Sequence, residues 1–182
     1  MRKQIRYAVV GLGHIAQVAV LPAFANARRN SRLVAVVSGD EAKRAAIMKK
    51  YEVPRGYSYE QYDECLSSGE VDAVYIALPN TLHCEYAVRA AQRGVHVLCE
   101  KPMAVDEDEC RRMADAARAA KVRLMVAYRL HFERANLEAI EVLRSGRLGE
   151  ARLHFKRLTA QAGADERAAL FRETVTKAYR LG

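Results

Sequence analysis

Short apolar runs alternate along this chain with stretches of helical periodicity. The apolar runs, rich in β-branched residues, fall at 5–10, 32–38, 71–79, 95–100 and 122–128, and a further short strand is expected near 56–58. The helical stretches fall at 14–27, 40–51, 59–68, 81–94, 106–121 and 132–149. Such an alternation predicts parallel strands joined by crossover helices. The predicted fold class is therefore α/β, a doubly wound parallel sheet with helices on both faces.

The carboxyl ends of the predicted strands carry glycine, polar or charged residues. These strand ends are Gly11–His14, Ser38–Gly39, Leu78–Asn80, Glu100–Pro102 and Tyr128–Arg129. Ligands of open parallel sheets bind outside the carboxyl ends of the strands. We therefore expect these five segments to form one site.

A glycine-rich turn, VVGLGHIA at residues 9–16, links the first strand to the first helix. It matches G-x-G-x-x-A, in which Gly11 permits a tight turn, Gly13 admits a pyrophosphate and Ala16 allows close packing. The helix start would offer free N–H groups to the phosphates. A purely structural turn is the alternative, and the position between strand and helix favours a Rossmann-type dinucleotide site.

The end of the second strand bears on the choice of cofactor. An NAD site usually has an acid there, whereas this strand ends in Ser38-Gly39 and Asp40 follows later. Lys43 or Arg44, one turn on, could hold a 2′-phosphate. The pattern favours NADP and leaves NAD open. In the alternative interpretation Asp40 only caps the helix and Lys43 lies in solvent.

The end of the fourth strand also carries residues suited to a site. In ALPNTLH, Pro79 ends the strand, Asn80 is expected to cap the next helix, and His83 lies in that helix's first turn. His83 lies either near the cofactor or at a helix end where its hydrogen bonds are satisfied locally.

In the first helical stretch, at 14–27, Pro22 is expected to bend or interrupt the helix.

The sequence CEKPMA places Lys101 at the tip of the fifth strand. Pro102 disfavours the helical region at Lys101, so the lysine is expected to be extended and to face the cleft. A lysine there can polarise a carbonyl or stabilise an alkoxide while hydride moves. An exposed lysine at a strand end is the alternative.

Composition bears on three further questions: nucleic-acid binding, metal sites and location in the cell. The net charge is +8, but basic residues are scattered, which argues against nucleic-acid binding. Cys65, Cys84, Cys99 and Cys110 form no framework and are expected to be free thiols. Cysteine and histidine spacings predict no metal site. No signal peptide or apolar run of about 18 residues is apparent, so we expect a cytoplasmic protein and no membrane partner.

The motifs GLGHIA, ALPNTLH, CEKPMA and AYRLHF occur in the order and spacing of the Gfo/Idh/MocA oxidoreductases. Over residues 4–150 the chain resembles this family, and within it the glucose–fructose oxidoreductase branch most of all. The resemblance implies NAD(P)-dependent chemistry. It also implies a Rossmann dinucleotide-binding domain over 1–150, followed in full members by an α/β substrate domain.

The resemblance also implies roles for individual residues. The residues implied to contact the cofactor phosphates are Gly11, Gly13, His14 and Ile15. Those implied to surround the adenosine 2′-position are Ser38, Gly39 and Lys43. Those implied to line the path to the nicotinamide ribose are Leu78, Pro79, Asn80 and His83. The E-K-P motif is matched by Glu100 and Lys101, with Lys101 as the catalytic lysine beside the nicotinamide, and Arg129 is implied to be a further cofactor contact.

The function implied is hydride transfer between NADP and a hydroxyl or carbonyl of a small sugar or polyol. The alternative is a non-catalytic dinucleotide-binding module that acts as a sensor or binds a partner. The family pattern stops near residue 150, so the substrate domain is expected to be largely missing. The tail at 151–182 is expected to hold a strand at its start and a basic helix from 163.

Three explanations of that tail stay open: a truncated or frameshifted product, which we favour, an isolated domain, or a changed C-terminal element. Whether the chain forms a homo-oligomer also stays open.

Overall fold

A computed structural model describes residues 4–147 of the chain. Its contacts divide the chain into two compact units, Met1–Leu130 and His131–Gly182, and each is described by itself. The strand and helix predicted in the tail at 151–182 lie outside the described residues. The domain division at residue 150 stays a prediction.

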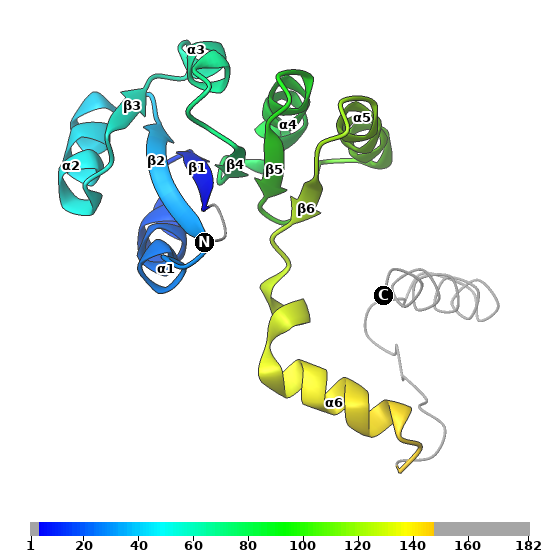
Figure 1. Cartoon of the computed structure of the whole chain (residues 1–182). Coiled ribbons are helices and arrows are strands. Elements are labelled where there is room, and N and C mark those ends of the chain that lie inside the picture. The colour runs from blue at the N-terminus through cyan, green and yellow to red at the C-terminus, as the bar shows by residue number, and fades with distance from the viewer. Residues whose placement is uncertain (1–3, 148–182) are drawn as a thin grey trace. The chain divides into compact units, whose positions relative to one another are not determined.

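The first unit is built on a six-stranded sheet with the order β3-β2-β1-β4-β5-β6 (Figure 1). Its strands are β1 Ile5–Val10, β2 Ser31–Val37, β3 Arg55–Tyr57, β4 Ala73–Ile76, β5 His96–Cys99 and β6 Leu124–Val126. Each neighbouring pair is parallel, which confirms the predicted fold class. The order reverses between β1 and β4, the place where doubly wound sheets bind nucleotides.

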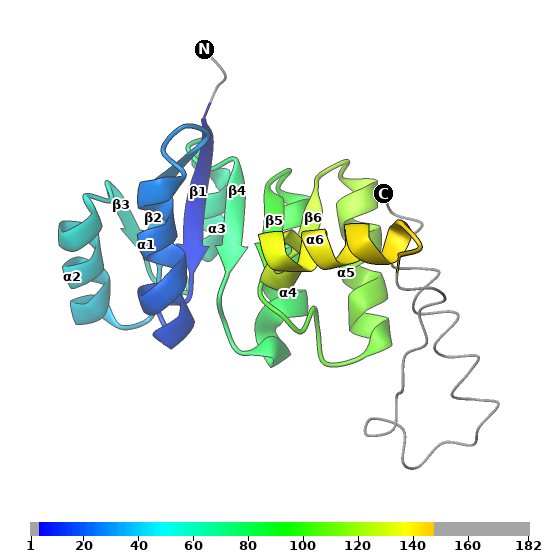
Figure 2. The same ribbon diagram turned by 90° about the horizontal axis from the view of Figure 1, so that it is seen from below.

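Helices cover the sheet from both sides, as the apolar strands require. They are α1 Leu21–Asn26, α2 Glu41–Tyr51, α3 Tyr62–Ser67, α4 His83–Gln92 and α5 Glu107–Ala119. Successive residues of β1 point to opposite faces, so Val9 packs with α1 and α2 while Val10 packs with α3, α4 and α5. Figure 2 shows α1 in front of the sheet and α3 behind it.

The first helix was expected to bend or break at Pro22, and the structure changes from a π to an α segment at that point without a gap between them. A π-helical segment, η1 Ala16–Val20, leads directly into α1, whose first turn contains Pro22. The Leu21 N–H donates to the Ala16 carbonyl, one residue beyond the α-helical partner. Proline lacks an N–H and its ring crowds the preceding turn, so we attribute the wider π turn to Pro22.

The helix ends largely follow the sequence. Asp40 caps α2 by accepting from the Lys43 N–H at 2.8 Å, and Asp106 caps α5 by accepting from the Glu109 N–H at 2.8 Å. Gly94 has φ +73, as its predicted place after α4 requires. The predicted cap by Asn80 is wrong: Asn80 begins a 3-10 turn, η2 Asn80–Leu82, and Leu82 precedes α4 without a side-chain cap.

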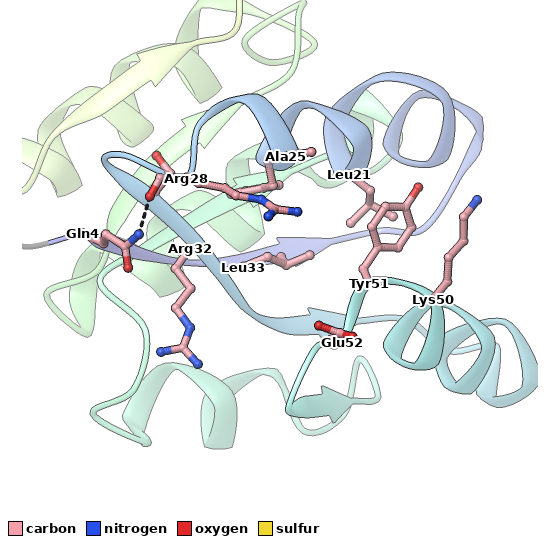
Figure 3. Close-up of a pocket in the computed structure, with 11 residues that line it drawn as sticks. Gln4, Leu21, Ala25, Arg28, Arg32, Leu33, Lys50, Tyr51 and Glu52 are labelled. Atoms are coloured by element: carbon pink, nitrogen blue, oxygen red, sulfur yellow. Dashed lines mark hydrogen bonds between the residues drawn. The ribbon is translucent and has the colours of Figure 1, made fainter.

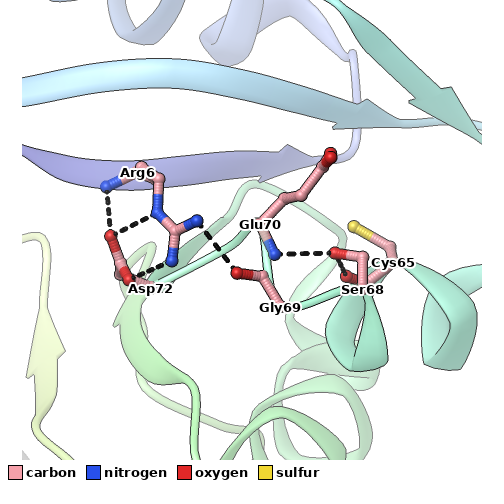
Figure 4. Close-up of polar contacts among 6 residues, drawn as sticks. All are labelled: Arg6, Cys65, Ser68, Gly69, Glu70 and Asp72. Carbon is pink, nitrogen blue, oxygen red and sulfur yellow. Dashed lines mark hydrogen bonds and ion pairs between the residues drawn. The ribbon is translucent and has the colours of Figure 1, made fainter.

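An ion pair ties β1 to the loop that precedes β4 (Figure 4). The Arg6 backbone N–H and Nε both donate to Asp72 Oδ2 at 2.9 Å, and Nη2 donates to Oδ1 at 2.7 Å. The remaining Nη1 donates to the Gly69 carbonyl at 2.9 Å. These bonds fix the relative position of β1 and β4 at the amino-terminal edge of the sheet.

The described part of the second unit contains α6, Arg134–Arg144, within the helix predicted at 132–149. A 3-10 turn, η3 Arg129–Phe132, precedes it. Arg134 Nε donates to Glu138 at 2.6 Å, an ion pair four residues apart on the helix surface. Such a pair supports an exposed helix.

Candidate functional site

The loops that leave the strands are held together at one edge of the sheet. In each case the first loop N–H donates to a carbonyl at the end of the neighbouring strand. These bonds join Gly11 to Val37 (2.9 Å), Ala77 to Val10 (2.8 Å), Glu100 to Ile76 (2.9 Å) and Ala127 to Cys99 (2.7 Å). The predicted site segments therefore begin side by side, on a frame that does not depend on their side chains.

The two glycines of the first turn have different surroundings. Gly11 has φ +90, and a Cβ there would lie 2.7 Å from the Ala77 carbonyl oxygen, so the fold itself requires glycine. A Cβ on Gly13 would meet nothing within 4 Å. Gly13 is exposed, so its missing side chain leaves room for a ligand and not for another part of the chain.

The residues around Gly13 complete the turn. Gln17 Nε2 donates to the Leu12 carbonyl at 2.8 Å and so holds the turn against the start of the helix. His14 is exposed on the open side, whereas Ile15 is partly buried and packs against the core beneath α1. Of these two predicted phosphate contacts, His14 has its side chain free to reach a ligand.

At the end of β2, Ser38 is buried and Gly39 is exposed. The Ser38 carbonyl accepts from Arg44 Nη1 at 2.6 Å. Lys43 is exposed, as in the alternative in which Asp40 only caps the helix, but its Nζ lies 3.2 Å from Asp40 Oδ2 and is paired with it. The pKa of Asp40 is lowered mainly by the hydrogen bond from the Lys43 backbone N–H and then by the one from the Lys43 side chain. The basic and acidic groups beside the predicted ribose position are therefore held together.

At the end of β4, Pro79 and Asn80 are exposed, whereas Leu78 and His83 are buried. His83 has 1% of its surface exposed. Its Nδ1 lies 2.9 Å from the Pro102 carbonyl oxygen, and its Nε2 lies 2.9 Å from the Leu78 carbonyl oxygen. His83 therefore connects the loop after β4 to the loop after β5.

At the end of β5, Glu100 is buried and Lys101 is exposed. Tyr75, on β4, donates its hydroxyl to Glu100 Oε1 at 2.7 Å, and the Lys101 N–H donates to Oε2 at 3.2 Å. Burial, and then the hydrogen bond to Glu100, raise the pKa of Tyr75, while the positive charge of Arg129 acts in the opposite direction. Arg129 therefore lies near this pair, and its side chain is exposed.

Two residues that support the site were not found from the sequence. Tyr75 stands inside an apolar run and looks like a core residue, while Gln17 stands inside a helical stretch. Their contacts, to Glu100 and to the Leu12 carbonyl, become visible only when strand pairing and the turn are known. The pairing of Tyr75 with Leu98 in β5 would have placed Tyr75 near Glu100.

A hollow of about 650 Å³ lies at the opposite edge of the sheet (Figure 3). Gln4, Ser31 and Leu33 line it at the amino ends of β1 and β2, far along the strands from the glycine turn.

In the described range, no group of three or more His, Cys, Asp or Glu side chains is placed to hold a metal ion. Within residues 4–147 no helix is both long and apolar enough to cross a membrane.

The family comparison matches this geometry. Residues 5–128, which contain the six strands of the described sheet and the glycine turn, match the model of the Gfo/Idh/MocA family, described as an oxidoreductase family with an NAD-binding Rossmann fold. The chain belongs to this family. The match confirms the family expected from the four motifs.

Individual relatives agree with the family assignment. A D-xylose 1-dehydrogenase (NADP(+)) from Haloferax volcanii is 34% identical over 76% of this chain and 42% of its own length. The crystal structure of an aldose-aldose oxidoreductase from Caulobacter crescentus, with glycerol, has a TM-score of 0.79 and 41% identity. It is covered over 45% of its length, and 82% of this chain is matched.

A third relative carries the other nicotinamide cofactor. A dehydrogenase from Bordetella pertussis, solved with NADH and UDP-GlcNAcA, is 30% identical with a TM-score of 0.72, covering 81% of this chain and 44% of its own. The chain therefore spans less than half the length of each of these three relatives.

Proposed function

We propose that this protein binds NADP(H) across the strand ends and takes part in hydride transfer to or from a sugar or polyol. The observation that carries the proposal is the contrast between the two glycines. The fold requires Gly11, whereas Gly13 faces open space at the start of the helix that begins with η1. A pyrophosphate placed there would meet backbone N–H groups without a clash.

The other cofactor contacts follow the edge of the sheet. Gly11, Gly13, His14 and Ile15 would form the phosphate turn, and Leu78, Pro79 and Asn80 would line the way to Glu100 and Lys101. Arg129 would add a positive charge at the far end. Exposed Gly13, His14, Asn80, Lys101 and Arg129 support this arrangement, because each presents a group on the open side.

The adenosine 2′-position favours NADP over NAD. Ser38 and Gly39 occupy the strand end, where the NAD-preferring acid would stand, and Lys43 is within one helical turn. Arg44 is close by, held by the Ser38 carbonyl. The NADP dependence printed for the xylose dehydrogenase supports the preference, while the NADH-bound relative keeps NAD as the competing cofactor.

Lys101 would be the proton-handling residue. The cofactor would supply the hydride when bound as NADPH and accept it when bound as NADP+. The exposed Lys101 ammonium, next to the buried Glu100, would donate a hydrogen bond to the substrate oxygen and stabilise negative charge developing on it. The names of the relatives, a xylose dehydrogenase and an aldose-aldose oxidoreductase, support a sugar or polyol substrate and favour turnover over a non-catalytic role.

The setting of the protein is also part of the proposal. Four free cysteines, three of them buried, support a reducing compartment, and we place the protein in the cytoplasm. We expect no nucleic-acid partner, because the basic residues do not form a block. Whether copies of the chain assemble is a question for a sizing measurement.

Fluorescence titration with NADPH and NADH tests cofactor binding. We expect saturable binding of both cofactors, with NADPH bound more tightly. Absence of binding of either cofactor at millimolar concentration would overturn the proposal.

Turnover is then measured with aldoses and polyols. Lys101→Ala should abolish any turnover and leave NADPH affinity within several-fold, while Lys49→Ala, on the last turn of α2, serves as the matched control. Binding without turnover across the panel would rule out catalysis by this chain alone.

A further inference from the structure

We infer that Tyr75 and His83 are positioning residues for Lys101, each acting through one of the two residues that flank the lysine. Tyr75 acts through Glu100 and His83 acts through Pro102. The inference deepens the proposed function and rests on it for the role of Lys101. It reassigns His83 from lining the cofactor path to holding the loop that carries the lysine.

The Tyr75 contact fixes the residue before Lys101. Glu100 is buried, and a buried carboxylate needs hydrogen-bond donors on its oxygens. One oxygen accepts from the Tyr75 hydroxyl and the other accepts from the Lys101 N–H. The carboxylate therefore joins a side chain of β4 to the backbone of the lysine. Because Tyr75 lies within a paired strand, its end of this link is rigid.

The His83 contact fixes the residue after Lys101. Its two ring nitrogens each lie 2.9 Å from a carbonyl oxygen, of Pro102 on one side and of Leu78 on the other. A carbonyl can only accept, so a neutral ring, which has one N–H, donates to one of the two carbonyls and packs against the other. His83 is almost fully buried in the first turn of α4. The ring therefore acts as a spacer that sets the distance between the two loops.

Together the two contacts hold the backbone on both sides of Lys101 while its side chain stays exposed. A catalytic group works best when neighbouring residues restrict where it can reach. Neither Tyr75 nor His83 needs to touch the substrate or the cofactor for this purpose. Loss of either contact should leave the lysine present but let its backbone move.

The test compares two pairs of variants in the full chain. Tyr75→Phe removes only the hydroxyl, and Tyr62→Phe is its control, because the buried Tyr62 hydroxyl donates to the Tyr86 carbonyl away from Lys101. His83→Phe removes both ring nitrogens. Its control is His96→Phe, because His96 Nδ1 accepts from the Arg123 N–H at the other end of β5.

Two readouts separate positioning from general stability. The first is hydrogen exchange of the Lys101 amide, measured by NMR without cofactor. We expect about five- to tenfold faster exchange in Tyr75→Phe and His83→Phe, the size of one lost hydrogen bond, and no change in the controls. The second is the emission of bound NADPH, which reports on the reduced nicotinamide, compared with the affinity for 2′,5′-ADP, which has no nicotinamide. We expect the emission to change and the 2′,5′-ADP affinity to stay within twofold.

The outcomes distinguish the two proposals. If exchange at Lys101 responds in Tyr75→Phe and His83→Phe alone, the positioning role is supported, even when NADPH fails to bind and the proposed function falls. If all four variants behave like the unmodified chain, or if controls and test variants change alike, the positioning role is overturned. Should His83→Phe not fold, His83→Gln replaces it. A second replacement, His83→Leu, also lacks both ring nitrogens and is the variant to use if His83→Gln keeps one of the two bonds. Lys101 exchange should rise in His83→Leu, and an unchanged rate there would overturn the inference for His83.

Discussion

Asp40 and Lys43 hold each other twice, once through the helix cap and once through their side chains. The Asp40 carboxylate accepts from the Lys43 N–H at 2.8 Å and lies 3.2 Å from Lys43 Nζ. The acid that caps α2 therefore also occupies the ammonium expected to meet a 2′-phosphate. Cofactor choice should depend on how strongly this acid competes for that lysine.

The substitution Asp40→Asn should strengthen NADPH binding by about two- to fivefold, the range of an exposed ion pair, and leave NADH within twofold. Asparagine caps a helix as well as aspartate does, so α2 should persist. Parallel titrations with the two cofactors, with circular dichroism as the folding control, measure the effect. A large loss of NADH affinity instead would identify Asp40 as the partner of the ribose hydroxyl and count against the NADP preference.

Gly11→Ala and Gly13→Ala should fail in different ways. At Gly11 the new methyl group meets the Ala77 carbonyl oxygen and the backbone has φ +90, so unfolding free energy should fall by about 1–3 kcal/mol. At Gly13 the methyl group meets open space, so stability should change by less than about 0.5 kcal/mol. NADPH affinity should nevertheless drop about tenfold or more in Gly13→Ala, because one added carbon blocks the close approach of a phosphate. Urea unfolding and NADPH titration of both variants decide this, and equal affinity in Gly13→Ala and the unmodified chain would contradict it.

The Arg6–Asp72 pair should contribute more to stability than the Arg55–Glu70 pair. In the first, three Arg6 donors converge on one carboxylate and a fourth reaches the Gly69 carbonyl. In the second, two guanidinium nitrogens meet Glu70 at 3.1 and 3.2 Å on a more exposed surface. Double-mutant cycles with Arg→Leu and acid→amide changes should give a larger coupling energy for Arg6–Asp72. Equal coupling energies for the two pairs would contradict the prediction, because the additional Arg6 donors (Figure 4) would then add no stability.

Stability should fall in alkaline solution partly because of two buried thiols. Burial raises the pKa of Cys65 and of Cys99 from 9.0 to about 12 in the folded state. The unfolded chain loses these protons first, so the stability is fully present below pH 9 and is lost as the pH rises from 9 toward 12. Chemical unfolding from pH 8 to 11 should show a shallower decline for Cys65→Val/Cys99→Val than for the unmodified chain. Cys110→Ser, at a partly exposed thiol, is the control and should keep the original slope.

The sheet could be predicted from the sequence because a short apolar run between helical stretches fits a strand that is buried on both faces of a parallel sheet. β1, β2 and β5 lie within a residue or two of the predicted runs. The predicted helix cap at Asn80 was wrong, because Asn80 begins a 3-10 turn and the regular helix starts only at His83. Local capping preference cannot reveal that delay.

The candidate site could be predicted as a set of strand ends but not as a set of contacts. Lys101 and Gly13 are exposed at the expected edge. The pairing of Tyr75 with Glu100 and the burial of His83 between two carbonyls depend on which strands are neighbours. Strand order is a property of the whole sheet, and no single motif contains it.

The placement of β4 beside β1 has a consequence for how the site comes into being. The strands β1, β2 and β3 follow one another in the chain, but β1 meets β4 only after the chain returns, as the 66-residue separation of Arg6 and Asp72 records. Closing so long a loop costs entropy and tends to be late in folding. The glycine turn belongs to the early half and Lys101 to the late half. A nascent or partly unfolded chain would therefore have the glycine turn without Lys101 beside it. The complete site would form only when β4 and β5 join the sheet next to β1.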